Sequence, residues 1–280
     1  MTKYTALAIT TNYWNPHDNY TDKILNALEN KVEDGDFVVV SEKAISTALG
    51  NMVDESFVNP SWSARVMARF WMRLVWGYPL GMLCGFGQRL LKRLRDYPLE
   101  SGSRHKQVAL QYAGFWQALM FGSEGGIDGS NLPYSYVSLP LNNAEELAQK
   151  IKNQIQLKLR KNVCVIIADT DKTYKFRNFF FTPRPNHLKG IHSLGASSTY
   201  LIGRILNLKK SSTPLTAVGC NLGASEALKI TNIADKARGP GSGATVWDMA
   251  ARFHVEVNEV SWEMLAAIRH KPIVIVRKTC

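Results

Sequence analysis

The sequence predicts a protein in which buried β-strands and amphipathic α-helices share one chain. Two apolar runs, Phe37–Val40 and Val163–Asp171, are typical of strands covered on both faces. Between them, Leu147, Ile151 and Ile155 recur at four-residue spacing, as on the buried side of a helix. At 280 residues, with 45% hydrophobic and 20% charged residues, the chain can form a single domain over 1–280 or two subdomains within it.

The composition indicates which binding partners and which cellular compartment are expected. A formal charge of +11 favours acidic partners such as nucleotides, polycarboxylates, nucleic acid or an anionic membrane surface. The four cysteines lie far apart without a CxxC pair, so neither a zinc motif nor a disulfide framework is expected. No stretch is apolar enough to span a membrane, and the N-terminus lacks the pattern of a signal peptide. These features predict a cytoplasmic protein.

The remaining elements follow from local patterns. A helix is expected behind a cap at Thr21, and a capping box at Asn143 and Glu146 should begin the helix that contains Leu147. A further helix is expected from Thr245. Strands are expected at Tyr4–Thr10, Gln107–Phe121 and Pro272–Val276.

The glycine-rich run Gly126–Asn131 (GIDGSN) is the strongest candidate for a chemical site. It presents a carboxylate, Asp128, and a carboxamide, Asn131, on a flexible turn. A second carboxylate, Asp169, stands where the 163–171 strand is expected to end. Mg²⁺ and Mn²⁺ take carboxylate, phosphate and water oxygens, so the two aspartates fit a metal that holds a phosphate in a water-accessible cleft. Either aspartate alone is more typical of an ordinary turn.

Two other features suit a phosphate and also have ordinary structural explanations. Lys43 follows a buried strand, where it could hold a phosphate or simply face solvent. The Gly239–Gly243 loop (GPGSG) runs into the helix expected from Thr245. Its backbone N–H groups could form a phosphate-binding nest, or the loop could be a mobile surface turn.

Residues 61–95 form an unusually basic segment, with seven Arg or Lys, three Trp and no acidic residue. We expect two helices separated by a break at Gly77–Gly81. The first helix should have two parallel stripes of side chains, of which the apolar one is expected to be buried. The apolar stripe is Trp62, Val66, Phe70 and Leu74, and the basic stripe beside it is Arg65, Arg69 and Arg73. The basic face could be a solvated surface, the rim of a pocket for an acidic substrate, or a patch for lipid or nucleic acid. Burial of the aromatic side chains would favour the substrate rim over lipid.

Several separated stretches together resemble the coenzyme F420-0:γ-glutamyl ligase family. They are DGDFVVVSEKAIS (34–46), GGIDGSN (125–131), SLPL (138–141), VIIADTD (165–171) with Arg177 after it, and PIVIVRK (272–278). The family joins L-glutamate to a deazaflavin precursor using GTP. The resemblance implies an α+β fold of mixed sheets with flanking helices, an intertwined homodimer, and a cleft for nucleotide and metal.

The resemblance also implies roles for individual residues. Asp128 and Asp169 match the family's metal carboxylates, Thr170 matches a further metal contact, and Arg177 is a catalytic candidate. The implied nucleotide contacts are Asn15, Pro16, Ser41, Glu42, Lys43 and Asn131. The implied ligands are Mg²⁺ or Mn²⁺, with K⁺ as a further candidate, GTP as co-substrate, and a deazaflavin precursor or another acidic small molecule with L-glutamate. Neither a nucleic-acid partner nor membrane association is expected.

The chain departs from the family pattern near its end. The family has a glycine-rich loop with a metal-binding Glu before its last strand, whereas Glu263–Pro272 (EMLAAIRHKP) contains no glycine. Glu226 and Glu263 are both candidates for the missing ligand, and Gly239–Gly243 is a candidate replacement for the loop. The resemblance implies an acyl-phosphate mechanism, in which an acceptor carboxylate attacks the γ-phosphorus and the amine of glutamate then opens the intermediate. Two alternatives remain, a ligase of the same fold for another acid and amine, and a non-catalytic protein that binds nucleotide or a membrane surface.

Overall fold

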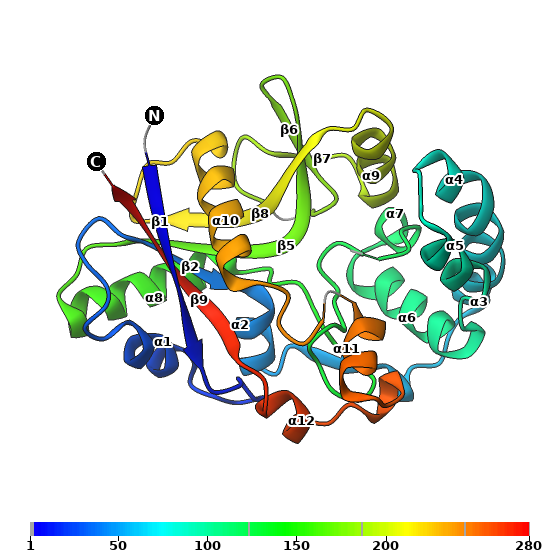
Figure 1. Cartoon of the computed structure of the whole chain (residues 1–280), viewed down its shortest axis with the longest axis horizontal. Helices are drawn as coiled ribbons and strands as arrows, with labels where there is room; N and C mark the ends of the chain where they lie inside the picture. The colour runs from blue at the N-terminus through cyan, green and yellow to red at the C-terminus, as the bar shows by residue number, and fades with distance from the viewer. Residues whose placement is uncertain (1–2, 123, 186, 244, 280) are drawn as a thin grey trace.

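A seven-stranded mixed sheet forms the centre of the molecule (Figure 1). The computed structural model describes residues 3–122, 124–185, 187–243 and 245–279. The strands run in the order β1-β9-β2-β5-β6-β7, and β8 pairs with β5. Their bounds are β1 Lys3–Thr11, β2 Phe37–Ser41, β5 Cys164–Phe176, β6 Phe179–Thr182, β7 His192–Ser193, β8 Lys209–Val218 and β9 His270–Thr279. Because β1 and β9 are antiparallel partners, the two ends of the chain lie side by side.

Helices cover both faces of this sheet, because neighbouring strand residues point to opposite sides. Val38 and Val40 of β2 pack in the cluster that contains α1 (Tyr20–Leu28), α2 (Glu42–Ala48) and α8 (Ala144–Leu159). Val39, between them, packs with Ile230 of α10 (Ala224–Arg238) on the other face. The expectation of strands buried on both sides is thus confirmed.

The other predicted elements are confirmed in part. The helices expected behind Thr21, at Leu147 and from Thr245 are α1, α8 and α11 (Val246–Phe253). Asn143 is the N-cap residue of α8, but its side chain makes no capping hydrogen bond within the described part of the chain, so the predicted capping box is wrong. The remaining short elements are β3 Met52–Asp54, η1 Glu55–Phe57, β4 Tyr136–Ser138, α9 Ala196–Ile205, η3 Val257–Glu259 and α12 Trp262–Ala266.

The predicted strand Gln107–Phe121 is wrong. This stretch lies in α6 (Leu99–Tyr112) and α7 (Phe115–Ala118), separated by a turn at Gly114, where φ is 98°. Val108 and Ala109 are buried in a cluster with Met67 and Ile127. Tertiary packing of this helical face therefore outweighs the strand propensity of its aromatic residues.

The basic segment forms a group of helices beside the sheet, on the right in Figure 1. Its helices are α3 Trp62–Val66, the π-helix η2 Met67–Leu80, α4 Gly81–Leu83 and α5 Gln88–Arg95. Helical backbone continues through Gly77–Gly81, so the break predicted there is wrong; the chain turns at Gly85, where φ is 66°.

The predicted apolar stripe of this segment is also wrong. Trp62 is 79% exposed, and Phe70 and Leu74 are each 52% exposed. The buried face instead contains Met67, Met72 and Trp76, spaced by five and then four residues. The π-helix explains the difference, because its i→i+5 hydrogen bonds give a wider turn than the α-helical turn assumed in the prediction.

A disulfide joins two segments of the sheet region. It links Cys164 of β5 to Cys220, after β8, with Cα atoms 5.3 Å apart, which corrects the expectation of no disulfide. The two residues are 56 positions apart in the sequence and meet only because β8 pairs with β5. Over the described ranges, no helix is both long and apolar enough to cross a membrane.

Four charged side chains join α6 of the helical group to Glu124 and to Glu55 of η1. Lys106 of α6 is fully buried and donates to Glu124 Oε1 at 2.8 Å. His105 contacts Glu55 through Nδ1 at 2.6 Å and Glu124 through Nε2 at 3.4 Å. Burial disfavours the charged carboxylate of Glu124, but Lys106 and His105 outweigh it and lower its pKa to about 2. Burial likewise opposes the imidazolium, but the two glutamates raise the pKa of His105 to about 10.

We therefore expect Glu124→Gln to lower the free energy of unfolding by about 3 kcal/mol near neutral pH, because Lys106 would remain charged and buried without its partner. The folded-state pKa of Glu124 lies below its unfolded value, so its contribution is full above pH 4.5 and is lost as the pH falls towards 2. Thermal or urea unfolding of wild type and variant between pH 3 and 7 measures this difference.

Glu100→Gln is the control, since Glu100 is largely exposed and pairs only with Arg104 one turn away. It should leave the unfolding midpoint nearly unchanged. Equal stability of wild type and Glu124→Gln at pH 6, or a difference that grows below pH 4.5, would contradict a stabilising role for the buried cluster.

Candidate functional site

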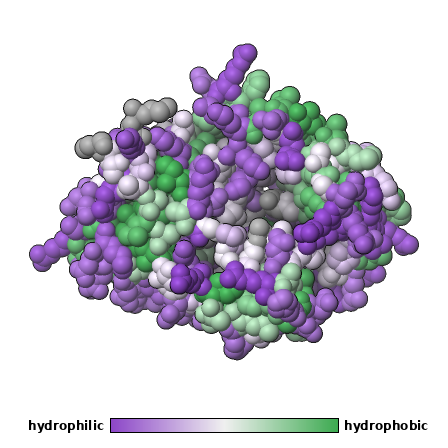
Figure 2. Space-filling view, viewed as in Figure 1, coloured by the Kyte–Doolittle hydropathy of each residue, from purple (hydrophilic) through white to green (hydrophobic). Residues whose placement is uncertain are grey.

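A cavity of about 1370 Å³ lies between the sheet and the helical group. Its wall is formed by the GIDGSN loop, the start of α2, the middle of β5, parts of α5 and α6, the loop from α10 to α11, and the start of β9. The surface is hollowed in this region in the space-filling view (Figure 2). The cavity is large enough to hold two small molecules together.

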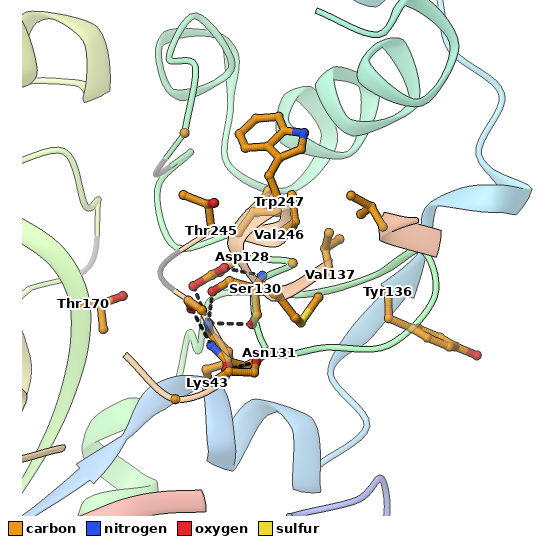
Figure 3. Close-up of a pocket in the computed structure, with 18 of the residues that line it drawn as sticks. Lys43, Asp128, Ser130, Asn131, Tyr136, Val137, Thr170, Thr245, Val246 and Trp247 are labelled. Carbon is orange, nitrogen blue, oxygen red and sulfur yellow. Dashed lines mark hydrogen bonds and ion pairs between the residues drawn. The ribbon is translucent and has the colours of Figure 1, made fainter. Parts of the chain in front are cut away.

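The GIDGSN loop and Lys43 form one wall of this cavity (Figure 3). Asp128 Oδ1 accepts from the backbone N–H of Ser130 at 2.7 Å, which fixes the turn. Lys43 Nζ lies 2.5 Å from Asp128 Oδ2 and donates to both oxygens of Ser130 at 2.8 Å. The structure therefore brings two of the predicted site residues, Lys43 and Asp128, into direct contact.

Arg184 is a central residue that sequence reasoning missed. Its side chain is fully buried, donates to Glu42 Oε1 at 2.7 Å, and lies 3.2 Å from Asp169 Oδ2. Burial disfavours its charge, but these carboxylates outweigh burial and raise its pKa. Gly126 is required beside it, because φ is 104° and an added Cβ would lie 1.2 Å from Arg184 Nη1. The sequence TPRPN offers no pattern that distinguishes this arginine from a surface one.

Glu42 and Asp169 consequently lie behind the cavity wall, so the expectation that Asp169 lies in a water-accessible cleft is wrong. Glu42 Oε1 also accepts from the backbone N–H of Leu141 at 2.8 Å. Burial, reinforced by the charge of Asp169 and only partly opposed by Arg184, raises the pKa of Glu42 to about 7. Glu42 thus joins the start of α2 to two distant segments, which accounts for its burial without a ligand.

β5 does not end at Asp171, as predicted, but continues to Phe176. Its pairing with β8 is irregular between Asp169 and Lys172, so that Thr170 and Asp171 form a bulge. The bulge exposes Thr170 to the cavity, across from Asp128 (Figure 3). The site residues on β5 are therefore presented by a bulge within the strand, and not by a loop at its end.

Asn131 connects the GIDGSN loop to the Gly239–Gly243 loop. Its Oδ1 accepts from the backbone N–H of Ser242 at 2.6 Å and from the Ser242 hydroxyl, and its Nδ2 donates to the carbonyl of Gly243 at 3.2 Å. The Tyr13 hydroxyl donates to the Asn131 carbonyl. Asn131 lines the cavity, but these contacts make it a clamp between two loops.

Other predicted site residues are distributed unevenly. Ser41 lines the cavity, whereas Asn15 and Pro16 lie just outside the lining, and their neighbours Tyr13 and Trp14 are part of it. Arg177, the catalytic candidate, is outside the described lining: it is exposed on the turn between β5 and β6, with its guanidinium 5.8 Å from the ring of Phe176.

The basic segment reaches the cavity through α5. The lining, as far as the structure describes it, includes Arg93 but none of Arg65, Arg69 and Arg73, so the interpretation of these three as the rim of a substrate pocket is not supported. Arg93 lies 5.2 Å from the ring centroid of Trp247 of α11, across the mouth. A smaller cavity of about 410 Å³ adjoins this contact; it is lined by Arg89, Lys92, Arg93, Asp96, Pro98 and Trp247.

The donor set fits a metal that is bound partly by phosphate. The Arg184 guanidinium contacts both Glu42 and Asp169, and Asp171 lies near enough to affect its charge. Asp169 Oδ2 is buried and has no well-aligned hydrogen bond from any described residue. Within the same described ranges, no three or more His, Cys, Asp or Glu side chains cluster as a complete metal site. A hard cation would need phosphate or water oxygens beside Asp128, Asp169 and Thr170.

The family model of F420-0:gamma-glutamyl ligases matches residues 8–207. The chain belongs to this family. An uncharacterized protein of Methanocaldococcus jannaschii, MJ1361, is 33% identical over 289 residues, which cover 97% of this chain and 96% of that protein. The family is one of ligases, and membership agrees with the mixed sheet and flanking helices described above.

The two candidates for the missing metal ligand lie elsewhere. Glu226, on the first turn of α10, accepts from the Tyr4 hydroxyl at 2.9 Å, and Glu263 is on α12. Neither residue belongs to the described lining of the cavity. This F420 ligase family member thus presents residues of two motifs, GIDGSN and ADTD, to one cavity, and neither candidate glutamate lies in the part of that lining which the structure describes.

Proposed function

We propose that this F420 ligase family member forms an amide bond between L-glutamate and coenzyme F420-0, or a related acidic acceptor, with GTP and Mg²⁺ or Mn²⁺. The family match supports a ligase of this general kind. The observation that favours nucleotide chemistry is the meeting of Lys43, Asp128 and Thr170 around one large cavity. Metal-dependent GTP turnover, screened against F420-0 and other acids with amino acids, tests the proposal and identifies any other acid and amine pair.

In the proposed reaction the acceptor carboxylate attacks the γ-phosphorus, and GDP leaves as the acyl phosphate forms. The amine of glutamate then attacks the acyl carbon, loses a proton and releases inorganic phosphate. A bound metal would neutralise phosphate charge. Asp128 and Thr170 line the cavity and would contact the metal there, and Asp169, which pairs with Arg184 behind the wall, would complete the set by turning its carboxylate towards them. Lys43 would exchange its contact with Asp128 for one with phosphate. No protein nucleophile is required, since positioning and charge stabilisation supply the catalysis.

Asp128→Asn and Asp169→Asn should each reduce metal-dependent GTP turnover about 100-fold or more, because each removes a charge that the metal requires. Their stabilities should differ. Asp128 is partly exposed and pairs with Lys43, so its variant should unfold at the wild-type temperature. Asp169→Asn removes a carboxylate from buried Arg184 and should cost about 3 kcal/mol.

Turnover at matched Mg²⁺ or Mn²⁺ concentrations and thermal unfolding measure these two effects separately. Asp34→Asn provides a control at an exposed position away from the cavity. Full activity of either site variant at the wild-type metal concentration would show that the metal assignment is wrong at that position.

The basic edge of the cavity favours an acidic acceptor. Arg89 and Lys92 of α5 line the smaller cavity, which shares Arg93, Pro98 and Trp247 with the lining of the main one. Replacing both by Gln should raise KM for F420-0 by about 3- to 10-fold at low salt with little change in kcat, because the positive field concentrates an anionic substrate at the entrance. The effect should shrink as ionic strength rises.

Arg65→Gln combined with Arg69→Gln is the matched control, because it removes the same charge from the same segment outside the described cavity wall. An equal rise in KM for both double variants would mean that the net charge of the protein attracts the substrate. An unchanged KM for the Arg89→Gln and Lys92→Gln double variant would contradict a role of these two residues in attracting it.

We also propose that the protein is a homodimer that buries the apolar surface around α9. Apolar side chains gather over α9 and α4 in Figure 2, and the exposed members are Met82, Leu83, Phe176, Phe179, Ile202, Ile205 and Leu206. A patch this apolar is typical of a protein interface. In a two-fold dimer the same patch of each subunit would face its copy, so both would be buried together.

Ile205→Asp combined with Leu206→Asp should therefore convert a dimer into a monomer, as measured by size exclusion with light scattering. Leu157→Asp is the control, since Leu157 is an exposed leucine on α8, away from α9 (Figure 1). A monomeric wild-type protein, or a dimer that survives the double substitution, would rule out this interface.

A further inference from the structure

Arg238 has a buried charge that the fold itself does not use. It is the last residue of α10 and lines the cavity. Its Nε and Nη2 are buried, and neither finds a hydrogen-bond partner in the described ranges. Burial lowers the pKa of this guanidinium, although Asp235 and Asp169 partly offset the effect. Leaving charged donors buried and unpaired is costly, so the arrangement is expected where a ligand supplies the missing acceptors.

The neighbouring carboxylates are already paired with other cations. Lys172 lies 3.0 Å from Asp235, Lys43 lies 2.5 Å from Asp128, and Arg184 contacts Asp169. Among the described cations of this wall, Arg238 differs from the exposed Lys236 in that its guanidinium nitrogens Nε and Nη2 are buried without an acceptor. An anion could enter without breaking any of these ion pairs.

His270, at the start of β9, also faces the cavity. Its Nε2 is buried and has no partner within the described structure. Burial and the charges of Arg238, Lys23 and Lys43 lower the pKa of His270 to about 3, so the ring is neutral at physiological pH. The cavity wall beside Arg238 therefore also contains a neutral hydrogen-bonding group whose Nε2 is unused by the described fold.

The loop that follows Arg238 is fixed in shape. Gly239 and Gly241 have φ values of 75° and 64°, a region that favours glycine. A Cβ on Gly241 would lie 2.6 Å from Asn131 Oδ1, and one on Gly243 would lie 2.5 Å from the backbone nitrogen of Met249. Asn131 holds Ser242 in place, so the loop is ordered against the cavity wall without a ligand. Such preorganisation lowers the entropic cost of binding.

We propose that Arg238, His270 and the Gly239–Gly243 loop form the subsite for the phosphate chain of the nucleotide. The inference rests on the proposed function, in which the cavity binds GTP. A guanidinium presents parallel N–H donors that match phosphate oxygens, and a neutral imidazole can donate one more. All of these residues lie beyond position 207, where the family match ends. They would occupy the role of the glycine-rich loop that is absent from 263–272.

Binding of inorganic tripolyphosphate and of GTP, each measured by calorimetry, tests the subsite without any acceptor or turnover. Arg238→Gln should weaken both ligands by about 10- to 100-fold, the effect of removing a charge-assisted contact to phosphate. Arg238→Lys should weaken them less, because lysine keeps the positive charge and loses only the paired N–H donors of the guanidinium. Neither variant should unfold at a lower temperature than wild type, since the two buried nitrogens support no hydrogen bond in the described fold.

Lys236→Gln is the matched control, because Lys236 is an exposed cation of the same helix end and also lines the cavity. It should weaken either ligand less than 3-fold or so, as expected for a solvated charge. Equal losses for Lys236→Gln and Arg238→Gln, or unchanged binding in Arg238→Gln, would overturn the subsite while leaving GTP binding elsewhere in the cavity intact.

Two other outcomes separate the subsite from the proposed function. Binding of tripolyphosphate that depends on Arg238, without binding of GTP, would support a phosphate site and reject a nucleotide ligase. A large loss of stability in both Arg238 variants would assign Arg238 a structural role and overturn the inference. Absence of binding of either ligand to the wild-type protein would overturn both.

Discussion

A buried guanidinium is the constraint on which the rest of this cavity depends. Arg184 cannot be solvated where it lies, so its counter-ions must come from the protein. Glu42 and Asp169 supply them from the start of α2 and from β5, and Gly126 leaves the space that the guanidinium fills. One side chain thus sets the relative positions of three segments that are distant in the sequence. The Asp128 loop follows directly after Gly126, so its placement depends on the same contact.

The same cavity shows two kinds of charge pairing, which have different consequences. Arg184 is enclosed and permanently paired, so it acts as scaffold. Lys43 and Asp128 form a partly exposed pair whose members can exchange partners when a cation or phosphate arrives. A ligand that carries both, such as a metal-bound phosphate, could replace the pair without leaving either charge uncompensated. The site therefore combines a fixed frame with an exchangeable pair at its surface.

The sequence predicted the parts of this arrangement that depend on local pattern. The Phe37–Val40 and 163–171 strands, the α8 helix and the helix from Thr245 follow from periodicity and caps, and GIDGSN, Lys43 and Thr170 lie at the cavity as expected. Arg184 could not be predicted, because nothing in the local sequence separates a buried arginine from an exposed one on a turn, such as Arg177 seven residues earlier. The bulge in β5 and the π-helix could not be predicted either, since both arise from pairing and packing with distant residues.

The region beyond residue 207 is as necessary to the fold as the part that matches the family. β2 is hydrogen-bonded on one side to β5 and on the other to β9, and Val38 lies opposite Ile275. Without β9 the strand that leads to Lys43 would become an exposed edge, and without α10 one face of the sheet would be uncovered. The same two elements bring His270 and Arg238 to the cavity. β9 and α10 thus complete the core and line the site at once. Substitutions in them that change ligand recognition must therefore preserve the packing of these two elements on the sheet.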